Sequence, residues 1–94
     1  MTTIIAATNR KDCRTEPIAR FVQSAFERIT DCETSFVSLK KIDFHEISEY
    51  SYDEQPKSIH QLQKKYMIPA QEFLFVVPEY NGSFPGVLKA FIDF

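Results

Sequence analysis

The chain has 94 residues, 44% of them hydrophobic, which leaves room for one small domain. Its formal net charge of -2 provides no basic surface for nucleic acid, and its longest apolar run, residues 73–77, is far shorter than the roughly 18 residues that a membrane helix needs. We therefore expect a cytoplasmic protein with no nucleic-acid or membrane partner. Cys13 and Cys32 form no ligand motif with histidine, so no metal site is predicted.

The first two predicted elements are a strand and a helix. Residues 2–7 are short, β-branched and apolar on both faces, which is typical of a buried parallel strand. A helix is predicted from Pro17, with Thr15 as its N-cap. Its apolar residues recur three and four positions apart on one face: Ile18, Phe21, Val22, Ala25, Phe26 and Ile29.

The same alternation continues along the chain. Residues 34–39 predict a second strand, followed by an acidic connection over residues 40–56 with a short helical turn near its middle. A second helix must end near Ile68, because Pro69 disfavours helical geometry in the residue before it. Residues 72–77 predict a central third strand with no polar face, and its Phe73 and Phe75, like Phe21 and Phe26, are expected in the core. Pro85 then opens a third helix with four inward side chains, Val87, Leu88, Phe91 and Ile92.

Alternating strands and helices predict an α/β fold with a doubly wound parallel sheet. Such sheets bind ligands beyond the carboxyl ends of their strands. The two most unusual stretches of the sequence lie at those ends: the first loop, residues 8–16, and the second loop, residues 78–84. Function is therefore expected in these two loops.

The first loop offers groups that can bind an anion. Thr8 and Thr15 have hydroxyl groups, Arg10 and Arg14 have guanidinium groups, and the predicted helix begins with N–H groups that lack helical partners. A phosphate fits such a loop. The simpler interpretation is that the hydroxyl groups cap the helix and the basic side chains are solvated, and Asp12 opposes anion binding.

The second loop has two interpretations. Its Asn81-Gly82 pair favours a type I′ hairpin between two strands. The helical spacing after Pro85 favours a strand-to-helix connection instead, in which Gly82 supplies an unusual backbone angle or a close approach to a ligand. Such a loop presents peptide N–H donors and the ring of Tyr80 to a planar ligand.

A family resemblance rests on both loops. PEYNGSFPGVLKAFIDF resembles the signature of the NADPH-dependent FMN reductase family, in which a P-E-Y-N-G-S loop runs into an L-K-x-x-I-D-[WF] helix. TNRKDCRT is similar to the phosphate loop of that family through Thr8, Arg10 and Thr15. The resemblance covers the chain from end to end and implies a flavodoxin-like fold, of which about three strands, in the order 2-1-3, are present here.

The resemblance also implies the cofactors and the site. FMN would be tightly bound between strands 1 and 3 and would carry the chemistry, so no catalytic side chain is expected. NADPH, or NADH, would reduce it, and the acceptor would be a quinone, azo compound, metal ion or free flavin. The first loop would bind the phosphate and the second would line the isoalloxazine ring. The expected cofactor-binding residues are Thr8, Arg10, Cys13, Arg14, Thr15, Pro78, Glu79, Tyr80, Asn81 and Gly82.

Three positions depart from the family pattern. Cys13 stands where serine is usual, Asp12 where glycine is common, and Ala7 where the strand often ends in glycine. A thiol among basic residues at a helix start also suggests a phosphatase with a cysteine nucleophile. That alternative needs C-x5-R, and position 19 is Ala19.

Family members carry two more strand-helix units, so residues 1–94 are expected to be the N-terminal part of a flavodoxin-like domain, truncated before strands 4 and 5. Without those strands, the third strand is expected to be an exposed edge with poorly covered apolar side chains. Two functions stay open. One is a reductase that binds FMN, alone or as a homo-oligomer. The other is a catalytically inactive module that acts only by pairing with a complementary chain.

Overall fold

Three parallel strands form the central sheet: β1 (Thr2–Ala6), β2 (Thr34–Ser38) and β3 (Glu72–Val76). The computed structural model describes all of residues 1–94 and places the strands in the order β2-β1-β3. In the middle of the sheet, Ile5 of β1 lies between a valine of β2 and a phenylalanine of β3. The predicted α/β class and strand order are confirmed, and each strand ends one residue earlier than predicted.

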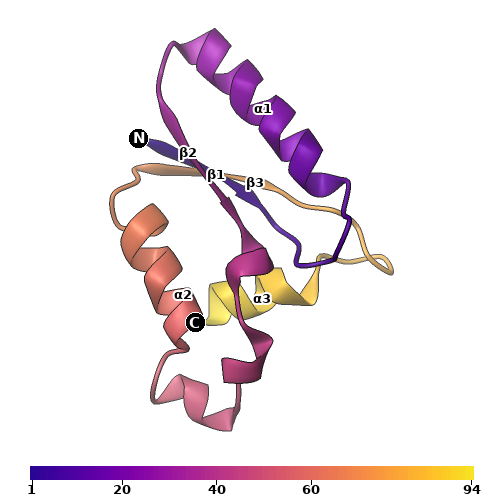
Figure 1. Ribbon diagram of the computed structural model, residues 1–94, viewed down its shortest axis with the longest axis vertical. Helices are drawn as coiled ribbons and strands as arrows, with labels where there is room; N and C mark the ends of the chain where they lie inside the picture. Colours follow the sequence, from indigo (N-terminus) through magenta and orange to yellow (C-terminus); the bar gives the residue numbers. More distant parts are fainter.

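Helices cover both faces of the sheet (Figure 1): α1 (Thr15–Thr30) lies on one face, and α2 (Lys57–Leu62) and α3 (Gly86–Asp93) lie on the other. Parallel neighbours require such crossovers, because a tight hairpin cannot join them. The N-cap of α1 is Arg14 and no side chain caps the helix, so the prediction of Thr15 as N-cap is wrong. The first N–H groups of α1 are therefore left without a side-chain acceptor.

The core has one apolar cluster on each face of the sheet. The larger cluster, of ten buried residues, joins Ile5 of β1 to Ile59 of α2 and Phe91 of α3. The smaller cluster lies under α1 and consists of Ile4, Ala6 and Ala19. Strand β1 supplies both clusters because successive side chains of a strand point to opposite faces.

Four side chains predicted to be buried are exposed. Phe21 of α1 is 70% exposed, Phe73 and Phe75 of β3 are 44% and 38% exposed, and Ile92 of α3 is 63% exposed. The core positions that the apolar pattern predicted for these side chains are wrong. The pattern of residues 72–77 alone favoured a central strand, but the predicted order 2-1-3 already makes the third strand an exposed edge, and the structure confirms that order. The physical reason is that β3 is an edge strand, as the order β2-β1-β3 requires, and no further element packs against its outer side.

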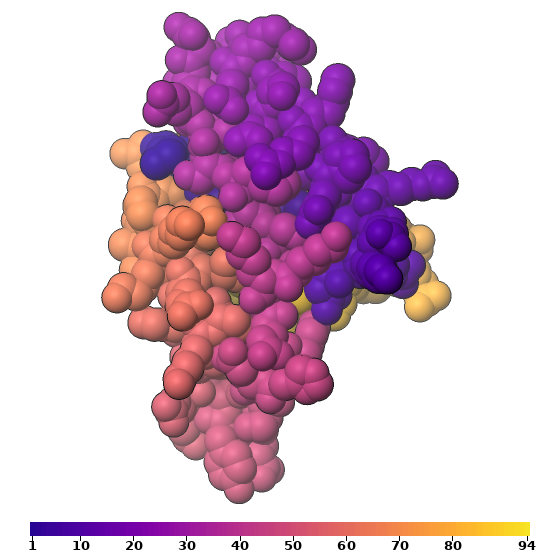
Figure 2. Space-filling view, viewed as in Figure 1, coloured from indigo at the N-terminus to yellow at the C-terminus, as the bar shows by residue number.

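The connection between β2 and α2 is more structured than predicted. It contains three short 3-10 turns, Leu39–Lys41, Phe44–Glu46 and Glu49–Tyr52, and the last two form part of the narrow lobe at the bottom of Figure 2. Helix α2 widens into a π turn, Gln63–Met67, and the helical backbone then ends at Ile68, as predicted. None of the helices has the length and apolar content that crossing a bilayer requires.

Candidate functional site

The two loops meet at the carboxyl end of the sheet, because β1 and β3 are neighbours and each loop follows one of them. The hydroxyl oxygens of Thr8 and Tyr80 lie 2.8 Å apart. The backbone N–H of Arg10 donates to Thr8 Oγ1 at 3.2 Å, and the guanidinium carbon of Arg10 lies 4.0 Å from the centre of the Tyr80 ring. These contacts join the first loop to the second loop without any ligand.

A pocket of about 300 Å³ lies between the loops. This volume is at the lower end of the range of small-molecule sites. Asp12 lines the pocket together with six of the ten predicted site residues: Arg10, Cys13, Arg14, Thr15, Pro78 and Tyr80. The structure thus brings together residues from both loops, although they are more than 60 positions apart in the sequence.

Free backbone donors run along the first loop. None of the N–H groups from Lys11 to Glu16 donates to a protein acceptor, and the run ends at the N-terminus of α1. Arg10 and Arg14 form no ion pair, since both ion pairs of the molecule lie elsewhere. Consecutive free donors, a helix N-terminus and two unpaired guanidinium groups are together well suited to a phosphate. The donor set of this loop therefore fits a phosphate group.

Asp12 explains how the first loop keeps its shape without glycine. Its φ is +54°, in the left-handed region. Most side chains lose about 1 to 2 kcal/mol there, but aspartate tolerates the conformation because its short side chain can form local hydrogen bonds. The resembled signature commonly has glycine at this position. The departure therefore preserves the backbone geometry, while the carboxylate adds negative charge to the wall of the pocket.

The second loop contains a tight two-residue turn. Asn81 and Gly82 have φ values of +54° and +81°. On either side of them, Tyr80 and Ser83 exchange backbone hydrogen bonds of 2.8 and 3.1 Å. Two successive positive φ angles are what a type I′ turn requires. The hairpin interpretation is therefore right locally, whereas the loop as a whole connects β3 to α3, whose N-cap is Pro85.

In the second loop, one side chain accepts a hydrogen bond from the turn, and two backbone N–H groups have no acceptor. The carboxylate of Glu79 accepts a hydrogen bond of 2.6 Å from the N–H of Gly82. The N–H groups of Glu79 and Asn81 have no protein acceptor. All three residues are exposed. The loop can therefore offer main-chain donors, beside the ring of Tyr80, to a planar ligand.

Thr8 differs from the other predicted site residues because it is completely buried. Its hydroxyl group contacts the Tyr80 hydroxyl and the Arg10 N–H, so this conformation leaves it no route to a ligand in the pocket. We expect Thr8 to act through Tyr80 and Arg10 as a positioning residue. No sequence pattern predicts the contact with Tyr80, which depends on the strand order.

Replacing Thr8 by valine tests this positioning role. The substitution removes the hydroxyl group with little change of shape, and we expect the free energy of unfolding to fall by about 1 to 3 kcal/mol because a buried hydrogen bond is lost. Urea unfolding followed by circular dichroism measures the change. Tyr80→Phe removes the same hydroxyl contact from the other side and leaves Thr8 with the Arg10 N–H, so a smaller loss is expected. An unchanged midpoint for both variants would show that the contact does not stabilise the protein.

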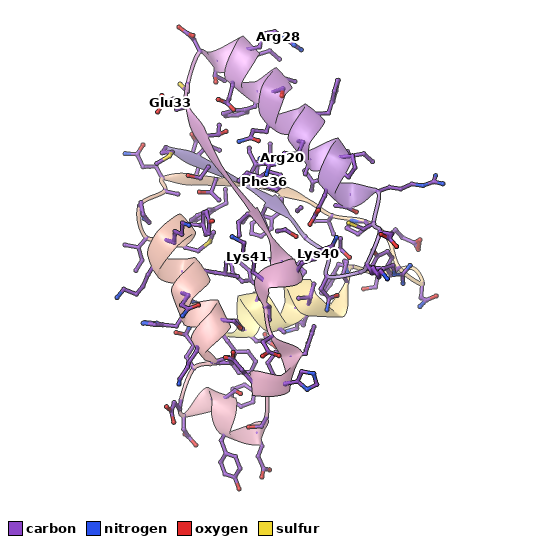
Figure 3. The ribbon with its side chains drawn as sticks, viewed as in Figure 1. Arg20, Arg28, Glu33, Phe36, Lys40 and Lys41 are labelled. Carbon is purple, nitrogen blue, oxygen red and sulfur yellow. The ribbon has the colours of Figure 1, made fainter.

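The largest pocket, about 490 Å³, lies away from the loops at the edge of β2. There the guanidinium carbon of Arg20 lies 3.6 Å from the centre of the Phe36 ring, and Figure 3 shows the two side chains together between α1 and β2. Lys41 Nζ lies 3.2 Å from the Tyr66 hydroxyl, and this hydrogen bond lowers the pKa of Tyr66 against the opposing effect of burial. The carboxylate of Glu16 also lines this pocket.

Comparison with known families gives one match. The family model described as NADPH-dependent FMN reductase matches residues 2–94. No curated protein and no solved structure matched the chain. The matched range contains both loops and all the residues around the pocket.

Proposed function

The chain belongs to the NADPH-dependent FMN reductase family, and from this premise we propose that it binds FMN tightly and oxidises NADPH. The electrons then pass to an acceptor such as a quinone, an azo compound, a metal ion or free flavin. The observation that carries this proposal is the run of free N–H groups from Lys11 to Glu16, which leads into α1 beside the ring of Tyr80. It supplies an anion site next to an aromatic surface.

The first loop is the proposed phosphate site. The backbone N–H groups at Cys13 and Arg14 and the hydroxyl of Thr15 lie at the start of α1, where the helix dipole favours negative charge. Arg10 and Arg14 add charge-assisted hydrogen bonds. Cys13 replaces the usual serine with a weaker donor, and the unpaired charge of Arg14 offsets that loss.

The second loop is the proposed isoalloxazine site. Pro78 and Tyr80 line the pocket, and the N–H groups of Glu79 and Asn81, in the same loop, have no protein acceptor. When bound, FMN would supply the hydride chemistry. The chain's own contribution is to orient the ring and to stabilise negative charge on it with fixed main-chain donors, which need no reorganisation.

The purified protein tests the proposal directly. We expect a yellow protein with flavin absorbance, and we expect added NADPH to be oxidised with a quinone as acceptor. A colourless protein that neither binds added FMN nor oxidises NADPH would overturn the proposal. NADH in place of NADPH, at equal concentration, measures the preference between the two nucleotides.

A second candidate function is a catalytically inactive module that works only when paired with a complementary chain. The exposed side chains of Phe73 and Phe75 on β3 favour it. A soluble, folded protein without bound flavin, which acquires flavin absorbance only in the presence of another chain, would support this second function over the first.

A further inference from the structure

A pocket of about 490 Å³ lies at the outer edge of β2, and we propose that it binds a phosphate monoester of a small aromatic molecule. It shares no lining residue with the pocket between the two loops. β2 is the edge of the sheet opposite β3, so strands that continue the sheet beside β3, as the family fold implies, would leave this pocket open. Binding here does not depend on whether the first loop binds FMN.

Two cations of this pocket have no carboxylate partner. Arg20 and Lys41 both line it, and neither takes part in an ion pair. The one carboxylate in the lining, Glu16, is already engaged, because it lies 3.6 Å from Lys40 Nζ and accepts a hydrogen bond of 2.5 Å from Ser38. The pocket therefore keeps two positive charges that the protein does not neutralise. A phosphate monoester carries close to two negative charges at neutral pH and is the matching anion.

Tyr66 and Arg20 supply hydrogen-bond donors to the pocket. The Tyr66 hydroxyl oxygen accepts from Lys41 Nζ at 3.2 Å, so the hydroxyl proton remains free for an acceptor. This hydrogen bond holds the pKa of Tyr66 below its usual range, against the opposing effect of burial, and a more acidic hydroxyl is a stronger donor. Arg20 uses one N–H for Gln23, at 3.2 Å, and keeps the other donors of its guanidinium group. Thr3 fixes the backbone of Tyr66 by donating to its carbonyl at 2.8 Å.

The edge strand adds a backbone donor. Three consecutive residues of β2, 36–38, line the pocket. β2 pairs only with β1, and alternate residues of such a strand direct their N–H and C=O groups away from the neighbour. At least one of the three residues therefore presents a backbone N–H to the outer side. An anion at this edge can accept from the main chain as well as from side chains.

The pocket also has a flat apolar part that suits a ring. Phe36 packs against the smaller core cluster under α1, and Tyr66 packs against the larger cluster on the other face, so the pocket extends around the edge of β2. The guanidinium group of Arg20 covers the Phe36 ring, with Pro17 also in the lining (Figure 3). A guanidinium plane can stack on a further ring. The volume is that of a site for a small organic molecule. We therefore place the ring beside Arg20 and Pro17, and the phosphate between Arg20 and Lys41.

Phenyl phosphate is the probe that tests this ligand class, because it joins one ring to a dianionic phosphate. We expect it to shift the amide NMR signals of Ser38 and Lys41 in a saturable way. Inorganic phosphate and phenol each lack one of the two parts, and each should bind at least about tenfold more weakly. Signals of these two amides that do not move would overturn the proposal, as would equal affinities for phenyl phosphate and inorganic phosphate.

Two arginines of α1 form a matched pair that locates the bound phosphate. Arg20→Gln removes a charge-assisted hydrogen bond, and we expect the affinity for phenyl phosphate to fall about ten- to a hundredfold. Arg28→Gln removes the same charge from the last turn of α1, which Figure 3 shows at the end of the helix away from the pocket, and should leave the affinity unchanged. Circular dichroism checks that both variants are folded. Equal affinities for the two variants would mean that this pocket does not hold the phosphate.

Arg10→Ala separates this pocket from the first loop. Arg10 does not line the pocket at β2, so its loss should leave the shifts at Ser38 and Lys41 unchanged. If Arg10→Ala removes these shifts while Arg20→Gln keeps them, phenyl phosphate binds at the first loop and the proposal is wrong. FMN binding is measured separately by flavin fluorescence, so failure of the pocket at β2 and failure of the flavin site are distinguishable.

Discussion

Gly82→Val is expected to abolish flavin binding. The φ of Gly82 is +81°, which a β-branched residue cannot adopt without strain. A Cβ at this position would meet no protein atom within 4 Å, so the obstacle is the backbone conformation itself. Valine should therefore open the turn that joins Tyr80 to Ser83 and displace the free N–H groups beside it. Isothermal titration with FMN measures the loss.

Two control substitutions separate the turn from its surroundings. Gly86→Ala also adds a Cβ into open space, but Gly86 has no positive φ and should tolerate it. Glu79→Gln keeps an acceptor for the Gly82 N–H and should weaken binding only slightly. If Gly82→Val binds FMN as the unchanged protein does, the second loop is not the isoalloxazine site.

Arg10→Ala is expected to weaken FMN binding by about ten- to a hundredfold. A hydrogen bond from a guanidinium group to a phosphate contributes about 1.5 to 3 kcal/mol, and 1.4 kcal/mol corresponds to a factor of ten. Riboflavin lacks the phosphate, so its affinity should change little. Fluorescence titration of both flavins measures the difference.

The neighbouring Lys11 provides the control for Arg10. Lys11 carries the same charge in the same loop but does not line the pocket, so Lys11→Ala should reduce FMN affinity much less. Arg10 also stacks on Tyr80, and an equal loss of FMN and riboflavin affinity would mean that this stacking, not a phosphate contact, is its role.

The hydrophobic pattern was sufficient to predict the strands and helices, but not which of their apolar side chains are buried. Residues 2–7 and 72–77 read as buried strands, and they do pair in the predicted order, because parallel strands with helical crossovers allow few other arrangements. The helix α1 was also predicted, but Ile18, Phe21 and Ile29 of its predicted apolar face are exposed. Patterning shows which side chains could be buried, whereas burial itself depends on a neighbour, and Phe21 has none.

The site was predicted in part for a similar reason. Thr8, Arg10 and Gly82 belong to local patterns of sequence, so both loops could be identified. The contacts that join the loops involve residue pairs such as Thr8 and Tyr80, which only the tertiary structure brings together. The left-handed φ of Asp12 was only partly predictable from the sequence. The glycine that the resembled family commonly has at this position indicates the conformation, but only the structure shows that aspartate adopts it.

The position of β1 in the sheet has a kinetic consequence. β1 is the first strand in the sequence and the central one in space, and its partner β3 begins 70 residues later, since Thr2 pairs with Glu72. The bond between Thr8 and Tyr80 spans 72 positions. Contacts between distant residues are slow to form because loop closure must come first. During folding, β1, α1 and β2 can assemble early, and the pocket between the loops is completed only when β3 docks.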